Sequence, residues 1–321
     1  MSQKGESSDL NIQLGPLALR NPIVTASGTF GYGLEFTDFV DLSLLGGICT
    51  KGLSLKPHAG NVPPRICETP AGMLNAIGLQ NVGVDIFLRE KLPKLRELHA
   101  TVIANVWGDV EEDYVAVVHA LEEAEGLAGI ELNISCPNVE KGGMLFGNSP
   151  QATASLVSRV RAATPRPLIV KLSPNAPDIV SSARAAHESG ADVLSLVNTF
   201  VGMAIDPETG RPLLSFGTGG LSGPAIKPLA VRMVFQVALA LPGVPIMGIG
   251  GISQLSDVLE FLAAGATAVQ VGTANFKEPG VSARLVAELA AYCEERGATV
   301  ASLVGRAHPP ESSQLETGAQ G

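Results

Sequence analysis

The chain has 321 residues, of which 45% are hydrophobic and 17% charged, and its formal net charge is −9. The acidic balance, without clustered lysines or arginines, argues against a protein that binds the phosphate backbone of nucleic acids. The N-terminus has no apolar segment and no run of about eighteen apolar residues occurs, so we expect no signal peptide, no membrane span and a cytoplasmic location. The length suits one large α/β domain at residues 1–308, followed by a flexible, disordered tail at 309–321.

The cysteines do not form a recognisable metal site. They are Cys49, Cys67, Cys136 and Cys293, and no two of them make a C-x-x-C pair. We therefore expect no zinc site, iron–sulfur cluster or other metal on this chain. Any such centre must belong to another chain.

In chain order, the predicted elements begin with a β-hairpin at residues 10–20, turning at Gly15-Pro16, which we expect to cap one end of the fold. Eight apolar runs follow, nearly continuous as in parallel strands buried on both faces. They lie at 22–25, 47–51, 101–106, 129–134, 167–172, 192–197, 244–249 and 268–271. Apolar residues three and four apart predict intervening helices at 111–125, 149–163, 177–189 and 254–264. The pattern predicts a (β/α)8 TIM barrel.

The carboxyl ends of barrel strands carry the active site in this fold, and two of them here end in glycine. Strand seven ends in Gly250-Gly251 and strand eight in Gly272-Thr273. Glycines let backbone N–H groups approach phosphate oxygens, and a helix N-terminus adds a favourable dipole. One such ending could simply terminate a strand, but two on consecutive strands favour a phosphate site.

Lysines and asparagines also gather at strand ends. Lys51 and Lys171 directly follow apolar strands, where an unpaired ammonium is costly to bury, so we expect them to face an anion in the barrel mouth. The alternative is that they extend along the rim to water. A planar ring with imide oxygens and N–H groups would suit the neutral side chains nearby, although any one of them could equally be a turn residue. These are Asn75, Asn81, Asn133, Asn138, Asn198 and Thr199.

Cys136 is the candidate for proton transfer. It follows strand four, precedes Pro137 and begins a glycine-containing loop that could move over the site. A lone cysteine is usually a buried, inert thiol, but a strand end beside Asn133 and Asn138 favours a chemical role. A free thiol pKa of about 8.5 needs only modest tuning to give a base near neutral pH.

Several motifs together resemble a known family. They are TKGLSLKPHAGNVPPRICETPAGMLNAIGLQNVG, ANVWG, LNISCPNV, VKLSPN, VNTF, GGLSGPAIKP, GIGGI and VGTANF. Across residues 10–305 they resemble the catalytic subunit of family-1 dihydroorotate dehydrogenases, in particular the NAD-linked class 1B. LNISCPNV with MLNAIGLQN is the most specific part. Val82 departs from the family's Pro in Gln-Asn-Pro-Gly, which affects loop stiffness.

This resemblance implies FMN-dependent oxidation of dihydroorotate to orotate in pyrimidine biosynthesis. Cys136 would take the proton from C5 of dihydroorotate while a hydride passes from C6 to N5 of the flavin. The implied FMN contacts are Ser27, Lys51, Gly52, Asn105, Asn133, Lys171, Val197, Gly223, Gly250, Gly251, Gly272 and Thr273. The implied substrate contacts are Lys51, Asn75, Ala76, Ile77, Gly78, Leu79, Asn133, Asn198 and Thr199.

The resemblance also implies a partner. Class 1B enzymes pair this chain with a subunit that carries FAD and an iron–sulfur cluster of the 2Fe–2S type and passes electrons to NAD+. We expect a heterotetramer built on a homodimer of this chain.

Four other functions stay open from the sequence. The chain could be a fumarate-linked relative, or a flavin barrel like that of dihydropyrimidine dehydrogenase, although the fused cluster-binding segments of that enzyme are absent. A sugar-phosphate isomerase or aldolase would use Lys171 as a Schiff-base former. The fourth possibility is a barrel that binds a ligand without catalysis. However, Cys136, both lysines and the asparagines are all present, so nothing in the sequence indicates inactivation. A yellow colour of the purified protein would favour the flavin hypothesis over the aldolase hypothesis.

Overall fold

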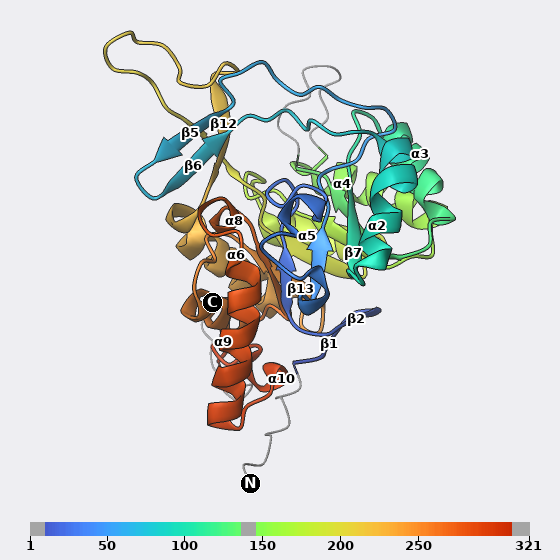
Figure 1. Ribbon diagram of the computed structural model, residues 1–321, viewed down its shortest axis with the longest axis vertical. Coiled ribbons are helices and arrows are strands. Elements are labelled where there is room, and N and C mark those ends of the chain that lie inside the picture. Colours follow the sequence, from blue (N-terminus) through green and yellow to red (C-terminus); the bar gives the residue numbers. More distant parts are fainter. Residues whose placement is uncertain (1–9, 136–145, 310–321) are drawn as a thin grey trace, which may run out of the picture.

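The computed structural model, shown in Figure 1, describes residues 10–135 and 146–309. Eight parallel strands close into a barrel in which they follow one another in chain order. Their bounds are β3 Ile23–Thr25, β4 Gly47–Cys49, β7 Val102–Val106, β8 Leu127–Asn133, β9 Leu168–Lys171, β10 Val193–Leu196, β13 Ile246–Ile249 and β14 Ala268–Val271. The predicted barrel and all eight predicted strands are confirmed, with ends displaced by at most two residues. Every residue of β7, β9 and β10 is buried, which explains their continuous apolar sequences.

Helices surround the barrel. The longer ones are α3 Glu111–Glu122, α4 Pro150–Ala163, α5 Ile179–Glu188, α6 Lys227–Ala240, α7 Leu255–Ala263 and α9 Val281–Arg296. The four predicted helices are confirmed as α3, α4, α5 and α7, and Ser149 and Asp178 cap α4 and α5 by accepting backbone N–H groups in the first turn. None of the described helices is both long and apolar enough to cross a membrane.

Short helical segments connect these elements. A continuous helical stretch between the second and third barrel strands consists of α1 Val84–Ile86, η3 Phe87–Lys91 and α2 Leu92–Glu97. The others are η1 Leu34–Phe36, η2 Leu42–Leu44, η4 Pro224–Ile226, α8 Ala274–Lys277 and α10 Val300–Leu303. Only Pro309 of the predicted tail is among the described residues.

The predicted N-terminal hairpin is confirmed and closes one end of the barrel. Its strands β1 (Ile12–Leu14) and β2 (Leu17–Leu19) pair antiparallel and lie at the lower end of the barrel in Figure 1. Leu14, Leu17 and Leu19 pack against an apolar layer formed by the barrel strands. That layer comprises Val24, Cys49, Ile103, Ile169, Val193, Met247 and Ala268.

A second sheet, absent from the sequence predictions, stands at the opposite end of the barrel (Figure 1). Its antiparallel strands run in the order β11 (Phe200–Met203), β12 (Thr218–Ser222), β6 (Gly72–Asn75) and β5 (Ile66–Thr69). Asn75 pairs with Gly220, so two segments 145 residues apart form one wall. This sheet extends the carboxyl end of the barrel into a walled chamber.

Candidate active site

A cavity of about 350 Å³ lies between the carboxyl ends of the barrel strands and the four-stranded sheet. Its volume is in the range of small-ligand sites. The structure brings nearly all of the sequence-predicted site residues to its wall. They are Ser27, Lys51, Gly52, Asn75, Ile77, Gly78, Leu79, Asn105, Asn133, Lys171, Val197, Asn198, Thr199, Gly223, Gly250, Gly251, Gly272 and Thr273.

Two other candidates lie away from the cavity wall. Ala76 is buried beside Leu74 and Leu214 rather than in the cavity wall. Asn81 lies outside the wall, where its amide bonds to the Ser54 hydroxyl and the Gly83 N–H, so it is the turn residue of the alternative interpretation. Cys136 and Asn138 lie outside the described residues.

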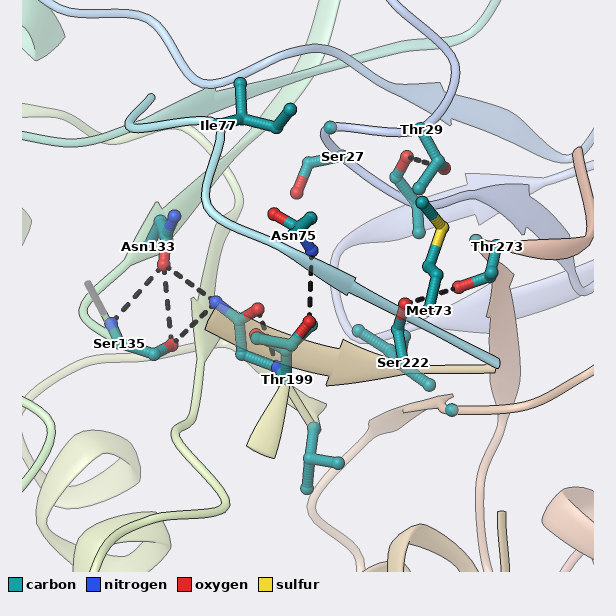
Figure 2. A pocket seen from close by; sticks show the side chains of 18 of the residues that line it. Ser27, Thr29, Met73, Asn75, Ile77, Asn133, Ser135, Thr199, Ser222 and Thr273 are labelled. Carbon is teal, nitrogen blue, oxygen red and sulfur yellow. Dashed lines mark hydrogen bonds between the residues drawn. The ribbon is translucent and has the colours of Figure 1, made fainter. Parts of the chain in front are cut away.

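Asn133, Ser135 and Asn198 form a hydrogen-bonded trio on one side of the cavity. The Asn133 Oδ1 accepts from the Ser135 N–H at 3.3 Å and from the Asn198 Nδ2 at 3.2 Å. The Asn198 Nδ2 also donates to the Ser135 Oγ at 3.2 Å. Figure 2 shows the side chains of Asn133 and Ser135 next to each other in the cavity wall. The trio uses the oxygen of Asn133, so its Nδ2 is the donor available to a ligand.

Asn105 presents an unused acceptor. The residue is 1% exposed, and its Nδ2 donates to Glu131 Oε1 at 2.7 Å. Its Oδ1 is buried without a partner among the described residues, yet Asn105 lines the cavity. An unpaired buried carbonyl costs roughly 1–3 kcal/mol, which a ligand N–H would recover. The position fits a planar ligand with an imide N–H.

The two lysines provide positive charge at different depths. Lys171 is 4% exposed and donates to the Ser27 Oγ at 3.2 Å. Lys51 is half-buried, and among the described residues it forms no ion pair within 4.0 Å. Burial lowers the pKa of Lys51, the neighbouring charge of Arg65 lowers it further, and Glu35 offsets this only in part. An incompletely neutralised ammonium of this kind attracts an anion.

The glycine endings form a cradle of free backbone donors. Among the described residues, the N–H groups of Gly251, Gly272 and Thr273 donate to no protein acceptor. Gly251 has φ +70°, and a Cβ there would lie 2.8 Å from the carbonyl oxygen of Gly223, so the two loops can meet only without a side chain. The helix that follows Thr273, α8, has only four residues, so the cradle depends on its N–H groups rather than on the expected helix dipole.

Some wall residues were missed by the sequence analysis. Ile66 and Met73 come from the unpredicted sheet, and Phe276 comes from the short helix α8. Thr273 donates to the Ser222 Oγ at 2.8 Å, as Figure 2 shows, which joins the cradle to β12. Ser135 was within reach of sequence reasoning, because it follows a strand end directly beside Asn133.

Fold and site together define a ligand-binding (β/α)8 barrel whose cavity offers N–H donors for a phosphate, amides for a planar ring and two lysines for negative charge. Among residues 10–135 and 146–309, no group of three or more His, Cys, Asp or Glu side chains could hold a metal ion.

Comparison with known proteins identifies the family. The family model described as dihydroorotate dehydrogenase matches residues 9–292. The chain is 55% identical over 298 residues to a protein of Geotalea uraniireducens, covering 92% of this chain and 97% of that protein. It is 54% identical over 301 residues to one of Geobacter sulfurreducens, covering 94% and 98%. Both relatives are named dihydroorotate dehydrogenase B (NAD(+)), catalytic subunit. The chain belongs to the dihydroorotate dehydrogenase family.

Proposed function

We propose that the chain oxidises dihydroorotate to orotate with a bound FMN, as the catalytic subunit of an NAD-linked dihydroorotate dehydrogenase. Family membership and the names of its relatives support the reaction and the NAD+ linkage. The observation that carries the proposal is that one cavity combines free N–H donors, an unpaired Asn105 Oδ1 and two lysines. A phosphate, an imide ring and an anionic substrate need these three kinds of group.

The FMN would lie along the deeper wall. Its phosphate would be held by the glycine endings and the loop before η4, because glycines and free N–H groups favour close approach to phosphate oxygens. The residues are Gly223, Gly250, Gly251, Gly272 and Thr273. Asn105, Lys171 and the other predicted contacts would meet the flavin ring. These contacts are Ser27, Lys51, Gly52, Asn133 and Val197. When bound, FMN supplies the hydride acceptor for C6 of dihydroorotate.

The substrate would lie at the outer part of the cavity. Lys51 would bind its carboxylate, and the amides of Asn75, Asn133 and Asn198 with Thr199 would bind the pyrimidine edge. The segment 75–79 would cover it through Ile77, Gly78 and Leu79, all of which line the cavity. Ala76 belongs to this proposal only as part of that segment.

Cys136 would be the base that takes the proton from C5. It follows Ser135, whose Oγ lies within the trio of Asn133 and Asn198 at the cavity wall. A thiolate formed there would accept the proton at its Sγ as the substrate loses its hydride. General-base catalysis of this kind contributes about 10²–10⁴-fold to a rate.

A partner subunit would carry FAD and an iron–sulfur cluster and pass electrons to NAD+. The words "catalytic subunit" in the relatives' names support a partner. Apolar side chains are exposed on and beside the four-stranded sheet at the upper end of the barrel, hereafter the upper sheet. Among them are Val201, Met203 and Ile205, and they support association of this chain with other chains. We propose a heterotetramer built on a homodimer; light scattering of co-expressed subunits showing only free monomer would contradict it.

The first test is the visible spectrum of the purified chain under anaerobic conditions, before and after addition of dihydroorotate. A flavin band that bleaches on addition would support FMN, substrate and half-reaction together. A flavin band that does not bleach would indicate a required partner or another substrate, such as the pyrimidine of a dihydropyrimidine dehydrogenase-like barrel. A colourless protein that takes up no added FMN would favour a sugar-phosphate barrel. Mixing the bleached protein with fumarate alone, or with the co-purified partner subunit and NAD+, would then separate the two acceptors.

A further inference from the structure

We propose that Glu131 is a positioning residue that fixes both the hydrogen-bonding direction of Asn105 and the net charge beside the flavin ring. The inference rests on the proposed FMN site and concerns a side chain that lies outside the cavity wall. Glu131 belongs to β8 and is 0% exposed, a rare environment for a carboxylate. Its burial must therefore be compensated by specific contacts.

The carboxylate is fully hydrogen-bonded by residues of four other barrel strands. Oε1 accepts from the Asn105 Nδ2 at 2.7 Å and from the Cys49 Sγ at 3.0 Å. Oε2 accepts from the Gln270 Nε2 at 2.7 Å and from the Ser195 Oγ at 2.9 Å. Cys49 can serve as a donor because burial and the neighbouring Glu131 charge raise its pKa well above the usual value.

The first consequence concerns the direction of the Asn105 amide. An ionised carboxylate only accepts hydrogen bonds, so the amide must turn its Nδ2 toward Glu131. The Oδ1 is then fixed on the side without a protein partner and serves the ligand. A neutral amide at position 131 would remove this constraint, because it both donates and accepts. Asn105 could then flip and present a donor where the proposed flavin needs an acceptor.

The second consequence concerns charge. The Lys171 Nζ lies 4.0 Å from Glu131 Oε1, and the two side chains are 5% and 0% exposed. Burial raises the pKa of Glu131, but the Lys171 charge and the donated hydrogen bonds outweigh it, so the pKa lies below its ordinary value. The pair is therefore an ammonium and a carboxylate with no net charge. Removing the carboxylate charge would leave Lys171 uncompensated and favour the more negative, reduced flavin.

The experiment compares Glu131→Gln with the parent chain. Apoprotein is titrated anaerobically with oxidised and with reduced FMN, and the two dissociation constants are measured by fluorescence at pH 6.5. We expect oxidised FMN to bind more weakly to E131Q. We also expect the ratio of the oxidised to the reduced dissociation constant to rise by about tenfold or more, equivalent to about 30 mV for a two-electron couple.

Two further variants separate the effect of the Glu131 charge from the effects of its hydrogen bonds and its position. Ser195→Ala removes one hydrogen bond to Glu131 and keeps its charge, so the ratio should stay within about twofold of the parent while the protein loses stability. Glu131→Asp keeps the charge one methylene further back. It should bind oxidised FMN about fivefold or more weakly, with a ratio within about threefold of the parent. If E131Q does not fold, E131D decides the positioning role.

The outcomes are distinct. An E131Q or E131D variant whose two constants match those of the parent overturns the inference and leaves the proposed function standing. A ratio that changes equally in S195A and E131Q also overturns it, since the charge would not be the cause. A parent chain that binds neither form of FMN overturns the proposed function, and the inference falls with it.

Discussion

The two ends of the barrel are built from the same strands but are filled in opposite ways. At the lower end, Leu14, Leu17 and Leu19 of the hairpin cover a layer of apolar strand residues. At the upper end the strands finish in lysine, asparagine and glycine around a cavity. Between these ends lies one polar cluster centred on Glu131. The strands therefore contribute to stability where they meet the hairpin and to ligand binding where they and the loops after them meet the cavity.

This contrast gives a rule for substitutions. A change at the lower end should lower the free energy of unfolding and leave ligand binding unchanged. A change at the upper end should weaken ligand binding and leave the free energy of unfolding nearly unchanged. The reason is that cavity residues there keep unpaired groups and uncompensated charge for a ligand. The following predictions test each side of the rule.

The largest expected effect is that of Cys136→Ala. If Cys136 is the base, reduction of the bound flavin by dihydroorotate should slow by about 10²–10⁴-fold, measured by anaerobic stopped-flow absorbance. FMN content should equal that of the parent, because the change leaves the cofactor contacts in place. The reduction rate of Cys136→Ser should lie between those of C136A and the parent, since a serine hydroxyl loses its proton less readily than a cysteine thiol. Reduction of C136A at the parental rate would assign the proton transfer to another group.

At the lower end, Leu14→Ala should cost about 2–5 kcal/mol of unfolding free energy, because it opens a space in a fully buried apolar layer. Denaturant titration of the apoprotein measures the loss. Ala18→Ser is the matched control, since Ala18 faces solvent on the same hairpin. The FMN dissociation constant of L14A should match the parent below its unfolding transition. A loss of FMN affinity in the folded variant would contradict the separation of the two ends.

Lys51→Met should weaken binding of dihydroorotate by about 10–100-fold, the loss expected for one charge-assisted hydrogen bond. The KM from steady-state rates, and orotate titration of the flavin spectrum, both report it. Lys56→Met is the control, because Lys56 is exposed and outside the cavity wall. Equal effects of K51M and K56M would mean that the overall charge, rather than the Lys51 position, attracts the substrate.

The smallest expected effect is a pH dependence. The pKa of Lys51 is lowered from its ordinary value of 10.5, so its positive charge is complete at low pH and is lost sooner than that of an exposed lysine as the pH rises. The KM for dihydroorotate should therefore rise as the pH increases through the alkaline range, beginning below pH 10.5. Lys51→Arg, which stays charged, should flatten the profile. A profile of K51R that rises like the parent's would assign the titration to another group.

Much of the fold could be read from the sequence, for a physical reason. Strands such as Val102–Val106 are buried on both faces, so they appear as uninterrupted apolar runs. The upper sheet could not be read in this way. Its strand Thr218–Ser222 is only partly buried and rich in glycine, and Ile66–Thr69 alternates exposed and half-buried residues in a run of four. Such segments form strands because of their pairing partners rather than their own propensity.

The site was predictable where chemistry follows a strand end and harder to predict elsewhere. Lys51, Asn133 and Gly250 could be placed because barrel geometry gathers such ends. Glu131 carried a signal that was not used: a lone acidic residue within an apolar strand is costly unless it is paired. Which residues pair with it could not be predicted, because Cys49 and Gln270 are distant in sequence and meet only across the closed barrel.

The hairpin under the barrel also has a consequence for ligand access, because its leucines fill the lower end. With the lower end filled, the cavity opens beside the upper sheet, where Ile66 and Phe276 at its wall are 50% and 55% exposed. Asn105 and Lys171, at 1% and 4%, are among the buried residues of the wall. If FMN lies against these buried residues and the substrate lies in the outer part, as proposed, FMN should depart only after the outer part is vacated. Orotate bound in the outer part would then block the dissociation of FMN. The loss of FMN from the stored protein should therefore slow when orotate is present.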